Sequence, residues 1–251
     1  MPSDLPVHGQ VIPPENLKSQ DWLNQINEWT QKNKMLINEK KCNSMIFNFT
    51  NLHQFTTRMK LNDQNIEIID SKKLLGTEIT NDLRWDSNTT KIVKKANASM
   101  GILRKAASFG ASREDLKLIY KLYVRSHLEH SAPVWHSGLT LENAKDLERV
   151  QKSAVRIIMG GQYESYKLAL SKLDLETLES RRKNLCLNFA QKCLKNPKLQ
   201  QMFPLNIKEH SMNTRHKQKY KVQFSKSERL KRSPIIYMQT LLNEEEIRKE
   251  K

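Results

Sequence analysis

The hydrophobic pattern changes near residue 86, and this change limits the possible folds more than any other feature. Before it, apolar residues come in short runs separated by polar turns. After it, they recur every three or four residues until about residue 200, the spacing of helices that each bury one face. The sequence therefore predicts an α+β fold that is mostly α. We expect a small antiparallel sheet with one helix over 17–86, a helical bundle over 87–200, and a basic, partly disordered tail with a short terminal helix over 201–251.

The first part begins with a leader, residues 1–16, that contains four prolines and is expected to be extended or disordered. A helix is predicted from Leu17 to about Asn33, with one apolar stripe formed by Trp22, Leu23, Ile26 and Trp29. Residues 57–61 and 66–69 flank the polar stretch 62–65, which predicts a hairpin. The run 74–79 predicts a further strand, in which Gly76 indicates a bulge or the close approach of another backbone.

The second part carries helix start and stop signals. Ser112 and Asp115 resemble a capping box before an apolar face from Leu116 to Leu128, and Pro133 is expected to end that stretch. Thr140 opens another predicted helix, for which Gly160-Gly161 is a suitable end. A short helix near 163–170 and a longer one ending before Pro197 follow. On the longer helix, we expect Arg181 or Arg182 to form an ion pair with Glu176 or Glu179, which lie nearby in the sequence.

The net charge of +16 lies entirely in the second part. Residues 1–90 hold 10 basic and 11 acidic side chains, whereas residues 91–251 hold 33 and 16. Residues 208–232 alone hold 9 basic and 2 acidic side chains. Such an excess predicts a polyanionic partner, RNA or DNA, because each neutralised phosphate releases counterions. The alternative is that the lysine-rich helices simply present solvated faces.

Several classes of protein do not fit the composition. No stretch approaches the ~18 consecutive apolar residues of a membrane span, so no membrane partner is expected. Three scattered cysteines (Cys42, Cys186, Cys193) form no disulfide framework and favour an intracellular, nuclear or cytoplasmic location. His127, His130 and His136 lack metal-protease spacing and are interpreted as core or surface histidines, so no metal site is predicted. Phosphate-binding glycine loops and a nucleophile elbow are absent from the sequence.

Five stretches in a fixed order carry a family resemblance. They are Trp22–Trp29 with Lys34–Lys41, Lys73–Gly76 with Leu83–Trp85, Leu116–Tyr120 with Val124–Trp135, Leu147–Ile158, and Leu178–Arg182. Together they cover about residues 20–190 and resemble the C-terminal part of a reverse transcriptase from a non-long-terminal-repeat retrotransposon of the jockey-like or a related kind. The resemblance implies the end of the palm, the primer grip, the thumb and downstream helices.

The resemblance also implies roles for individual residues. Lys41 matches the lysine of the family's fourth palm motif, whose role there is protonation of the leaving pyrophosphate; a plain turn lysine is the alternative. Leu74, Leu75 and Gly76 would contact the primer backbone, or form an ordinary buried strand. A set of helical cations would contact phosphates as thumb residues do, or form a solvated helix face: Arg104, Lys105, Arg149, Lys152 and Arg156.

The family's Tyr-x-Asp-Asp hairpin and its upstream aspartate precede the first match, and nothing in residues 1–20 replaces them. Mg²⁺ is therefore expected only in an intact family member, and this chain alone is expected to need no cofactor and to be inactive as an RNA-directed DNA polymerase. The residual function would be sequence-independent binding of RNA or an RNA–DNA duplex, with the missing palm and fingers as a possible protein partner. The alternatives are a helical protein-interaction module, or an expressed transposon relic with no activity.

Overall fold

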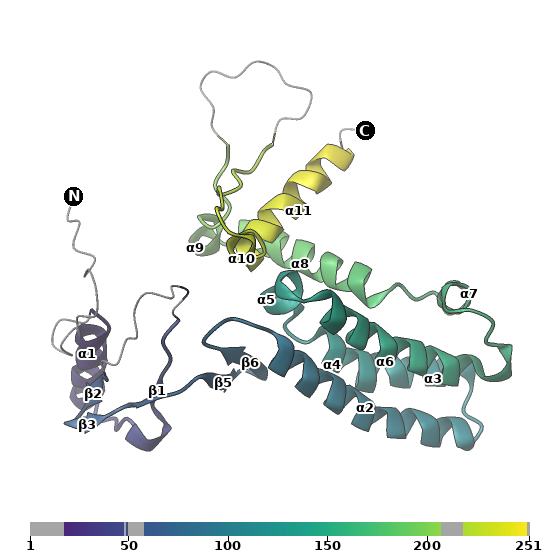
Figure 1. Cartoon of the computed structure of the whole chain (residues 1–251), viewed down its shortest axis with the longest axis horizontal. Helices are drawn as coiled ribbons and strands as arrows, with labels where there is room; N and C mark the ends of the chain where they lie inside the picture. Colours follow the sequence, from purple (N-terminus) through teal and green to yellow (C-terminus); the bar gives the residue numbers. More distant parts are fainter. Residues whose placement is uncertain (1–17, 48, 50–57, 207–217, 250–251) are drawn as a thin grey trace, which may run out of the picture. The chain divides into compact units, whose positions relative to one another are not determined.

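The computed structural model describes residues 18–47, 49, 58–206 and 218–249, and the leader 1–16 lies outside them. The chain divides into two compact units, residues 1–84 and 85–251, which are considered separately below (Figure 1). Short strands with one longer helix make up the first unit, and helices make up the second. The predicted class, α+β and mostly α, is confirmed.

The first unit pairs its strands two at a time. Its elements are α1 (Lys18–Lys32), η2 (Glu39–Lys41), β1 (Asn43–Ser44), β2 (Lys60–Leu61), β3 (Gln64–Asn65), β4 (Glu67–Ile68), β5 (Ser71–Leu74) and β6 (Thr77–Thr80). β2 pairs with β3 and β5 with β6, both antiparallel, whereas β1 pairs with β4 in parallel. The predicted antiparallel pairing is confirmed for β2–β3 and β5–β6, but the described strands form three two-stranded sheets and the β1–β4 pair is parallel. Turn signals between neighbouring runs reveal hairpins, but a parallel pair between distant segments leaves no such local signal.

Polar side chains hold α1 to the first hairpin. The side-chain amide of Gln20 accepts from the backbone N–H of Lys60 and donates to its carbonyl, both at 2.8 Å. Asn62, at the hairpin turn, accepts from Asn27 at 2.8 Å and donates to Glu39 at 2.7 Å. The predicted apolar stripe of α1 faces outward instead, because Trp22 is 66% exposed and Trp29 is 58% exposed.

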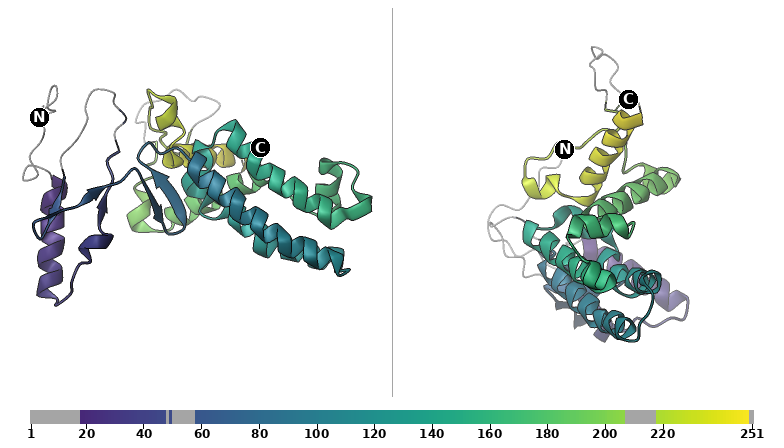
Figure 2. Two further views of the ribbon diagram at one scale, coloured as in Figure 1. Left: turned by 60° about the horizontal axis from the view of Figure 1, so that its bottom comes forward. Right: turned by 90° about the vertical axis from the view of Figure 1, so that its right-hand side faces the viewer.

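The second unit is built around α2 (Asp86–Ser108) and α6 (Leu141–Met159), which lie side by side in Figures 1 and 2. The other elements are α3 (Arg113–Ile119), η3 (Tyr120–Arg125), α4 (Ser126–Glu129), α5 (Ala132–Trp135), η4 (His136–Gly138), η5 (Gly160–Gln162), α7 (Tyr166–Lys172), α8 (Leu178–Leu194), α9 (Pro197–Gln200), α10 (Glu228–Lys231) and α11 (Pro234–Lys249). Every third or fourth side chain of the long helices is buried in a shared core, including Ala96, Met100, Leu103, Leu147, Ala154 and Ile158.

Local capping fixes where these helices begin and end. The hydroxyls of Ser112 and Thr140 accept from the backbone N–H groups of Asp115 and Asn143 at 3.2 and 3.1 Å, as predicted. Gly160 ends α6 with a φ of +52°, a backbone conformation that side chains with a Cβ rarely adopt. Pro133 does not end the preceding helix; that helix stops at Glu129, and Pro133 lies in the first turn of α5.

A π-helical segment, η3, lies inside the continuous run from α3 to α4. Leu116, Tyr120, Val124 and Leu128 follow one another at intervals of four residues, and none is more than 5% exposed. In a regular α-helix each interval of four overshoots a full turn by about 40°, so three intervals would carry Leu128 about 120° around the helix. The wider i→i+5 turn of η3 compensates for this drift and keeps the four side chains on one face.

The C-terminal region contributes to the core. Cys186, Ala190 and Cys193 of α8 are buried in one cluster with residues from beyond position 200: Phe203, Tyr220, Met238, Leu241 and Leu242. The terminal helix α11 has 16 residues and is therefore longer than predicted. It packs against α8 (Figure 1). The partial disorder predicted for the tail is not found in residues 218–249, which include α10 and α11. Residues 207–217 of the predicted tail lie outside the described residues. No helix in the described part of the chain is long and apolar enough to cross a membrane.

Candidate nucleic-acid interface

Helix α6 carries a stripe of four cations along its outer face. Its opposite face is buried against the core, and Thr140 and Gly160 fix its two ends. Lys145, Arg149, Lys152 and Arg156 are all exposed and follow one another at intervals of four, three and four residues, which places them on one side of the helix. We call these four residues the α6 stripe. An α-helix rises 1.5 Å per residue, so the stripe extends over about 16 Å, the length of roughly five nucleotides along one DNA strand.

The members of the stripe have different neighbours. The guanidinium of Arg149 forms an ion pair with Asp146 on the same helix. Lys152 lies with its Nζ 5.2 Å from the ring centre of Tyr166, and Arg156 with its Cζ 5.4 Å from the ring centre of Tyr163. Among the residues that the structure describes, neither Lys152 nor Arg156 forms an ion pair with a carboxylate. The predicted phosphate contacts Arg149, Lys152 and Arg156 are therefore together on one surface, and their charges differ in how far they are neutralised.

A groove runs between α2 and α6. It has a volume of about 410 Å³ and is lined by Thr89, Thr90, Val93, Lys94, Asn97 and Asp146. Lys94 contributes positive charge on the α2 side, and exposed Lys91 and Lys95 lie on the same stretch of that helix. Asp146 links the groove to the stripe, because it lines the groove and binds Arg149.

The other two predicted helical cations, Arg104 and Lys105, lie in the last turns of α2. Both are exposed. As neighbours in the sequence they point about 100° apart around the helix axis, so they do not form one row. Neither forms an ion pair with a carboxylate in the described part of the chain. They are available for phosphate contact but do not belong to the α6 stripe.

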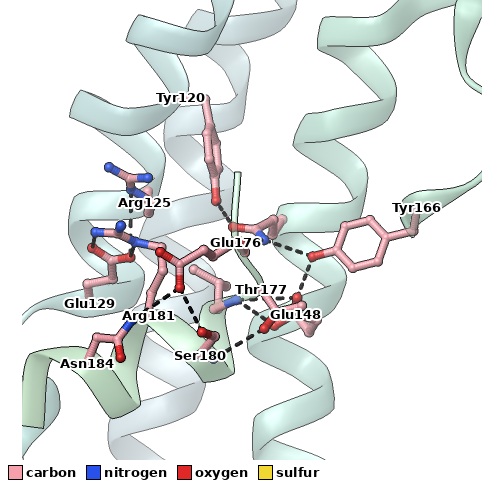
Figure 3. A network of polar contacts seen from close by, with 12 residues as sticks. Tyr120, Arg125, Glu129, Glu148, Tyr166, Glu176, Thr177, Ser180, Arg181 and Asn184 are labelled. Atoms are coloured by element: carbon pink, nitrogen blue, oxygen red, sulfur yellow. Dashed lines mark hydrogen bonds and ion pairs between the residues drawn. The ribbon is translucent and has the colours of Figure 1, made fainter. Parts of the chain in front are cut away.

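On the inner side of α6, a network of polar groups supports the helix that carries the stripe (Figure 3). The hydroxyl of Tyr120 donates to the side-chain carbonyl of Gln151, whose amide donates to the hydroxyl of Tyr166 at 2.8 Å and to the carbonyl of Glu176 at 2.9 Å. The Tyr166 hydroxyl in turn donates to Glu148. Burial and the Glu148 carboxylate raise the pKa of Tyr166, and burial raises the pKa of Tyr120, so both phenols stay protonated donors.

The same network fixes the start of α8. Glu148 accepts from the backbone N–H of Leu178 at 3.2 Å, and the Thr177 hydroxyl accepts from the N–H of Ser180, also at 3.2 Å. A carboxylate at a helix N-terminus is favoured by the unpaired backbone donors there. Four helices, α3 with its π segment, α6, α7 and α8, are thereby joined by side chains that no local sequence signal predicted.

Arg181 finds its partner far away in the sequence. Its guanidinium makes two hydrogen bonds to Glu129, one of them 3.1 Å long, and Arg125 lies 3.7 Å from the same carboxylate. Glu176 instead accepts from Ser180 at 2.7 Å and from Asn184 at 3.2 Å (Figure 3). The expected structural ion pair of Arg181 or Arg182 is confirmed for Arg181, but its partner is Glu129 rather than the nearby Glu176 or Glu179. The wider turn of the π segment changes the direction in which Arg125 and Glu129 point, so residue spacing along a regular helix does not predict that they face α8.

Arg182 is fully buried and is no surface contact. Its Nε donates to Nδ1 of His136 at 3.4 Å, and its guanidinium carbon lies 5.9 Å from the ring centre of Trp135. His136 contacts the hydroxyl of Tyr237 at 3.3 Å through Nε2. Burial, together with the positive charges of Arg182 and Lys183, lowers the pKa of His136 to about 4. His136 is therefore a neutral structural link between α5, α8 and α11.

The predicted residues of the first unit lie at exposed turns. Lys41 ends η2, where its backbone N–H donates to the carbonyl of Asn38 at 3.0 Å. Leu74 pairs with Thr77 across the β5–β6 hairpin, so Leu75 and Gly76 form its two-residue turn, with φ angles of +47° and +93°. Leu74 is 57% and Leu75 is 89% exposed, so the reading of this segment as a buried strand with a bulge was wrong. Two positive φ values make this a type I′ turn, for which Leu-Gly is not a typical pair.

No described group of three His, Cys, Asp or Glu side chains is placed to hold a metal ion. His127 and His136 lie in separate surroundings, and burial raises the pKa of the Cys186 thiol to about 12, so it stays protonated. No family model, curated protein or solved structure matches this chain. Lys145, Lys91, Lys94 and Lys95 were missed as site residues. The spacing 145–149–152–156 is visible in the sequence and could have identified Lys145.

Proposed function

We propose that this chain is a fragment of a retrotransposon reverse transcriptase without the catalytic aspartates, and that it binds RNA or an RNA–DNA primer–template duplex independently of sequence. The α6 stripe is the observation on which this proposal rests. Four exposed cations at helical spacing on a capped, core-supported helix make a rigid row of positive charge. Such a row suits phosphates, which repeat regularly and carry no base identity.

The order of elements adds support from the resemblance. A helix containing Trp22 and Trp29 is followed by a turn with Lys41, a hairpin at 71–80 and then long helices. This order is what the family's palm end, primer grip and thumb would require. By the same resemblance, nucleotide transfer is not expected of this chain alone.

Salt dependence tests the binding. The dissociation constant for a labelled RNA–DNA duplex is measured from low to moderate salt for the wild type and for R149Q/K152Q/R156Q. Each lost phosphate contact lowers the slope of log K against log[salt] by about 0.9, so the triple variant should lose up to about 2.7. The control K192Q/K195Q/K198Q removes three exposed charges at the end of α8 and in α9, and it should keep the wild-type slope.

If the salt slope fell equally in both triple variants, only the net charge would attract the duplex, without a specific site. Absence of wild-type binding at low salt would reject the proposal and leave a relic or a protein-interaction module. A preference among unrelated duplex sequences would contradict sequence-independent binding.

One observation favours a protein-interaction module as a second candidate function. Trp22, Ile26 and Trp29 lie at helical spacing on the exposed face of α1 and, with Gln25, line a shallow hollow of about 380 Å³. Helices that dock into a partner's groove use anchors at such spacing. Sedimentation of the wild type and of W22A/W29A, alone and over a concentration series, tests whether this face drives association; identical behaviour would count against it.

A further inference from the structure

Two tyrosines after α6 cover the last two cations of the α6 stripe. Tyr163 follows η5 and lies against Arg156, with 5.4 Å between the guanidinium carbon and the ring centre. Tyr166 opens α7 and lies against Lys152, with 5.2 Å between Nζ and the ring centre. The chain turns back after α6 to form α7 (Figure 1), and the two contacts place both rings beside the cations of the helix.

Contacts to the rest of the second unit hold the Tyr166 ring and the turn that carries Tyr163. The Tyr166 hydroxyl bonds to Glu148 and Gln151, and Gln151 is fully buried and also holds Tyr120 (Figure 3). The turn that carries Tyr163 is attached to the start of α3, because Arg113 donates to the side-chain carbonyl of Gln162 at 2.5 Å. Tyr166 is therefore a fixed ring and Tyr163 lies on an anchored turn, so that each can support a flexible cationic side chain.

A ring leaves a cation free to bind phosphate, whereas a carboxylate does not. A guanidinium stacked on an aromatic ring uses its face, and its N–H donors in the plane remain available. Arg149 differs, because one of its N–H donors is bonded to Asp146, whose carboxylate offsets part of its charge. Long cationic side chains lose up to about 2 kcal/mol of rotamer entropy on immobilisation, so a side chain that is already ordered loses less when it binds.

We propose that Tyr163 and Tyr166 are positioning residues that hold Arg156 and Lys152 ready for the phosphates of a bound nucleic acid. This inference rests on the proposed function, because it assigns roles within the same surface. It ranks the cations of the stripe: Arg156 and Lys152 contribute more to binding than Arg149, whose charge is partly offset by Asp146.

A double-mutant cycle on Tyr163 and Arg156 tests the proposal with the full chain and an RNA–DNA duplex. Y163F keeps the ring and should bind as the wild type does. Y163L keeps apolar bulk but loses the ring face, and it should bind about 2- to 5-fold more weakly, the size of an exposed cation–π contact. R156Q should reduce the salt slope by about 0.9, and Y163L/R156Q should bind no more weakly than R156Q.

The cycle separates positioning from a merely structural role. If Y163L weakens binding equally with and without Arg156, Tyr163 acts through the fold and the inference is wrong. If Y163L binds as tightly as the wild type, the inference is also wrong. The same cycle on Tyr166 and Lys152 is interpretable only if Y166L keeps the wild-type melting temperature. If Y166L melts at a lower temperature, the Tyr163 cycle alone tests the inference. Failure of the wild type to bind would reject the proposed function itself, a different outcome from either of these.

Discussion

The two units use different means to hold their backbones. In residues 18–84, strands of two to four residues pair in twos, and side-chain amides such as that of Gln20 tie α1 to a hairpin. Among the described residues of this unit, Leu61 and Ile66 are the buried large apolar side chains. In residues 85–206 and 218–249, helices of up to 23 residues bury apolar side chains along their length. The difference shows the effect of length: a longer run of apolar residues at helical spacing stabilises the fold more, because each further turn adds a buried side chain.

The largest expected effect is a cavity in the helical unit. Leu147 of α6 is fully buried, so L147A should lower the free energy of unfolding by about 2–5 kcal/mol. Leu36 of the first unit is 98% exposed, and L36A should change it by less than about 0.5 kcal/mol. Urea denaturation followed by circular dichroism measures both. Similar losses for the two variants would contradict the contrast between the units.

A smaller effect should appear on acidification, again in the helical unit. The pKa of His136 is about 4 in the folded chain, below its ordinary value of 6.5. Between these values the unfolded chain binds a proton that the folded chain does not. The contribution of the neutral His136 to stability is therefore fully present above pH 6.5 and is lost progressively as the pH falls to about 4.

The variant H136Q isolates this pH effect. A glutamine can still accept from Arg182 and donate to Tyr237, but it does not titrate. The difference in unfolding free energy between wild type and H136Q should depend on pH between 6.5 and 4 and be constant at higher pH. A difference that stays constant throughout this range would mean that His136 titrates normally.

The smallest expected effect is a gain, and it concerns the first unit. Leu75 has a φ of +47° in the β5–β6 turn, where a leucine is strained and Asn-Gly is the preferred pair. L75N should stabilise the hairpin and slow amide hydrogen exchange in β5 and β6 about 2- to 5-fold, whereas L74N, outside the turn, should not. Faster exchange in L75N would show that the Leu75 side chain stabilises the hairpin by more than its strained backbone destabilises it.

Local signals predicted much of the helical unit. Ser112, Thr140 and Gly160 mark helix ends through contacts within a few residues, and such contacts are visible in the sequence. The partner of Arg181 was not predictable, since Glu129 lies 52 residues away and reaches it through a π segment without a sequence signature. The Leu75-Gly76 turn was missed because its composition is apolar. Of the candidate interface, the cations of α6 were predicted except Lys145, but the tyrosines beside them were not.

The π segment at 120–125 also bears on how this chain can change in length. A regular α-helix turns about 100° per residue, so if one residue of the segment were lost and ordinary hydrogen bonding restored, the eleven steps from Leu116 to Leu128 would end only about 20° beyond three full turns. Leu116 and Leu128 would then still share a face, and Glu129 would keep its direction toward Arg181. A single-residue deletion at this place is thus accommodated without a change of helical phase, whereas the same deletion in a regular part of the helix would turn one side of it by about 100° relative to the other.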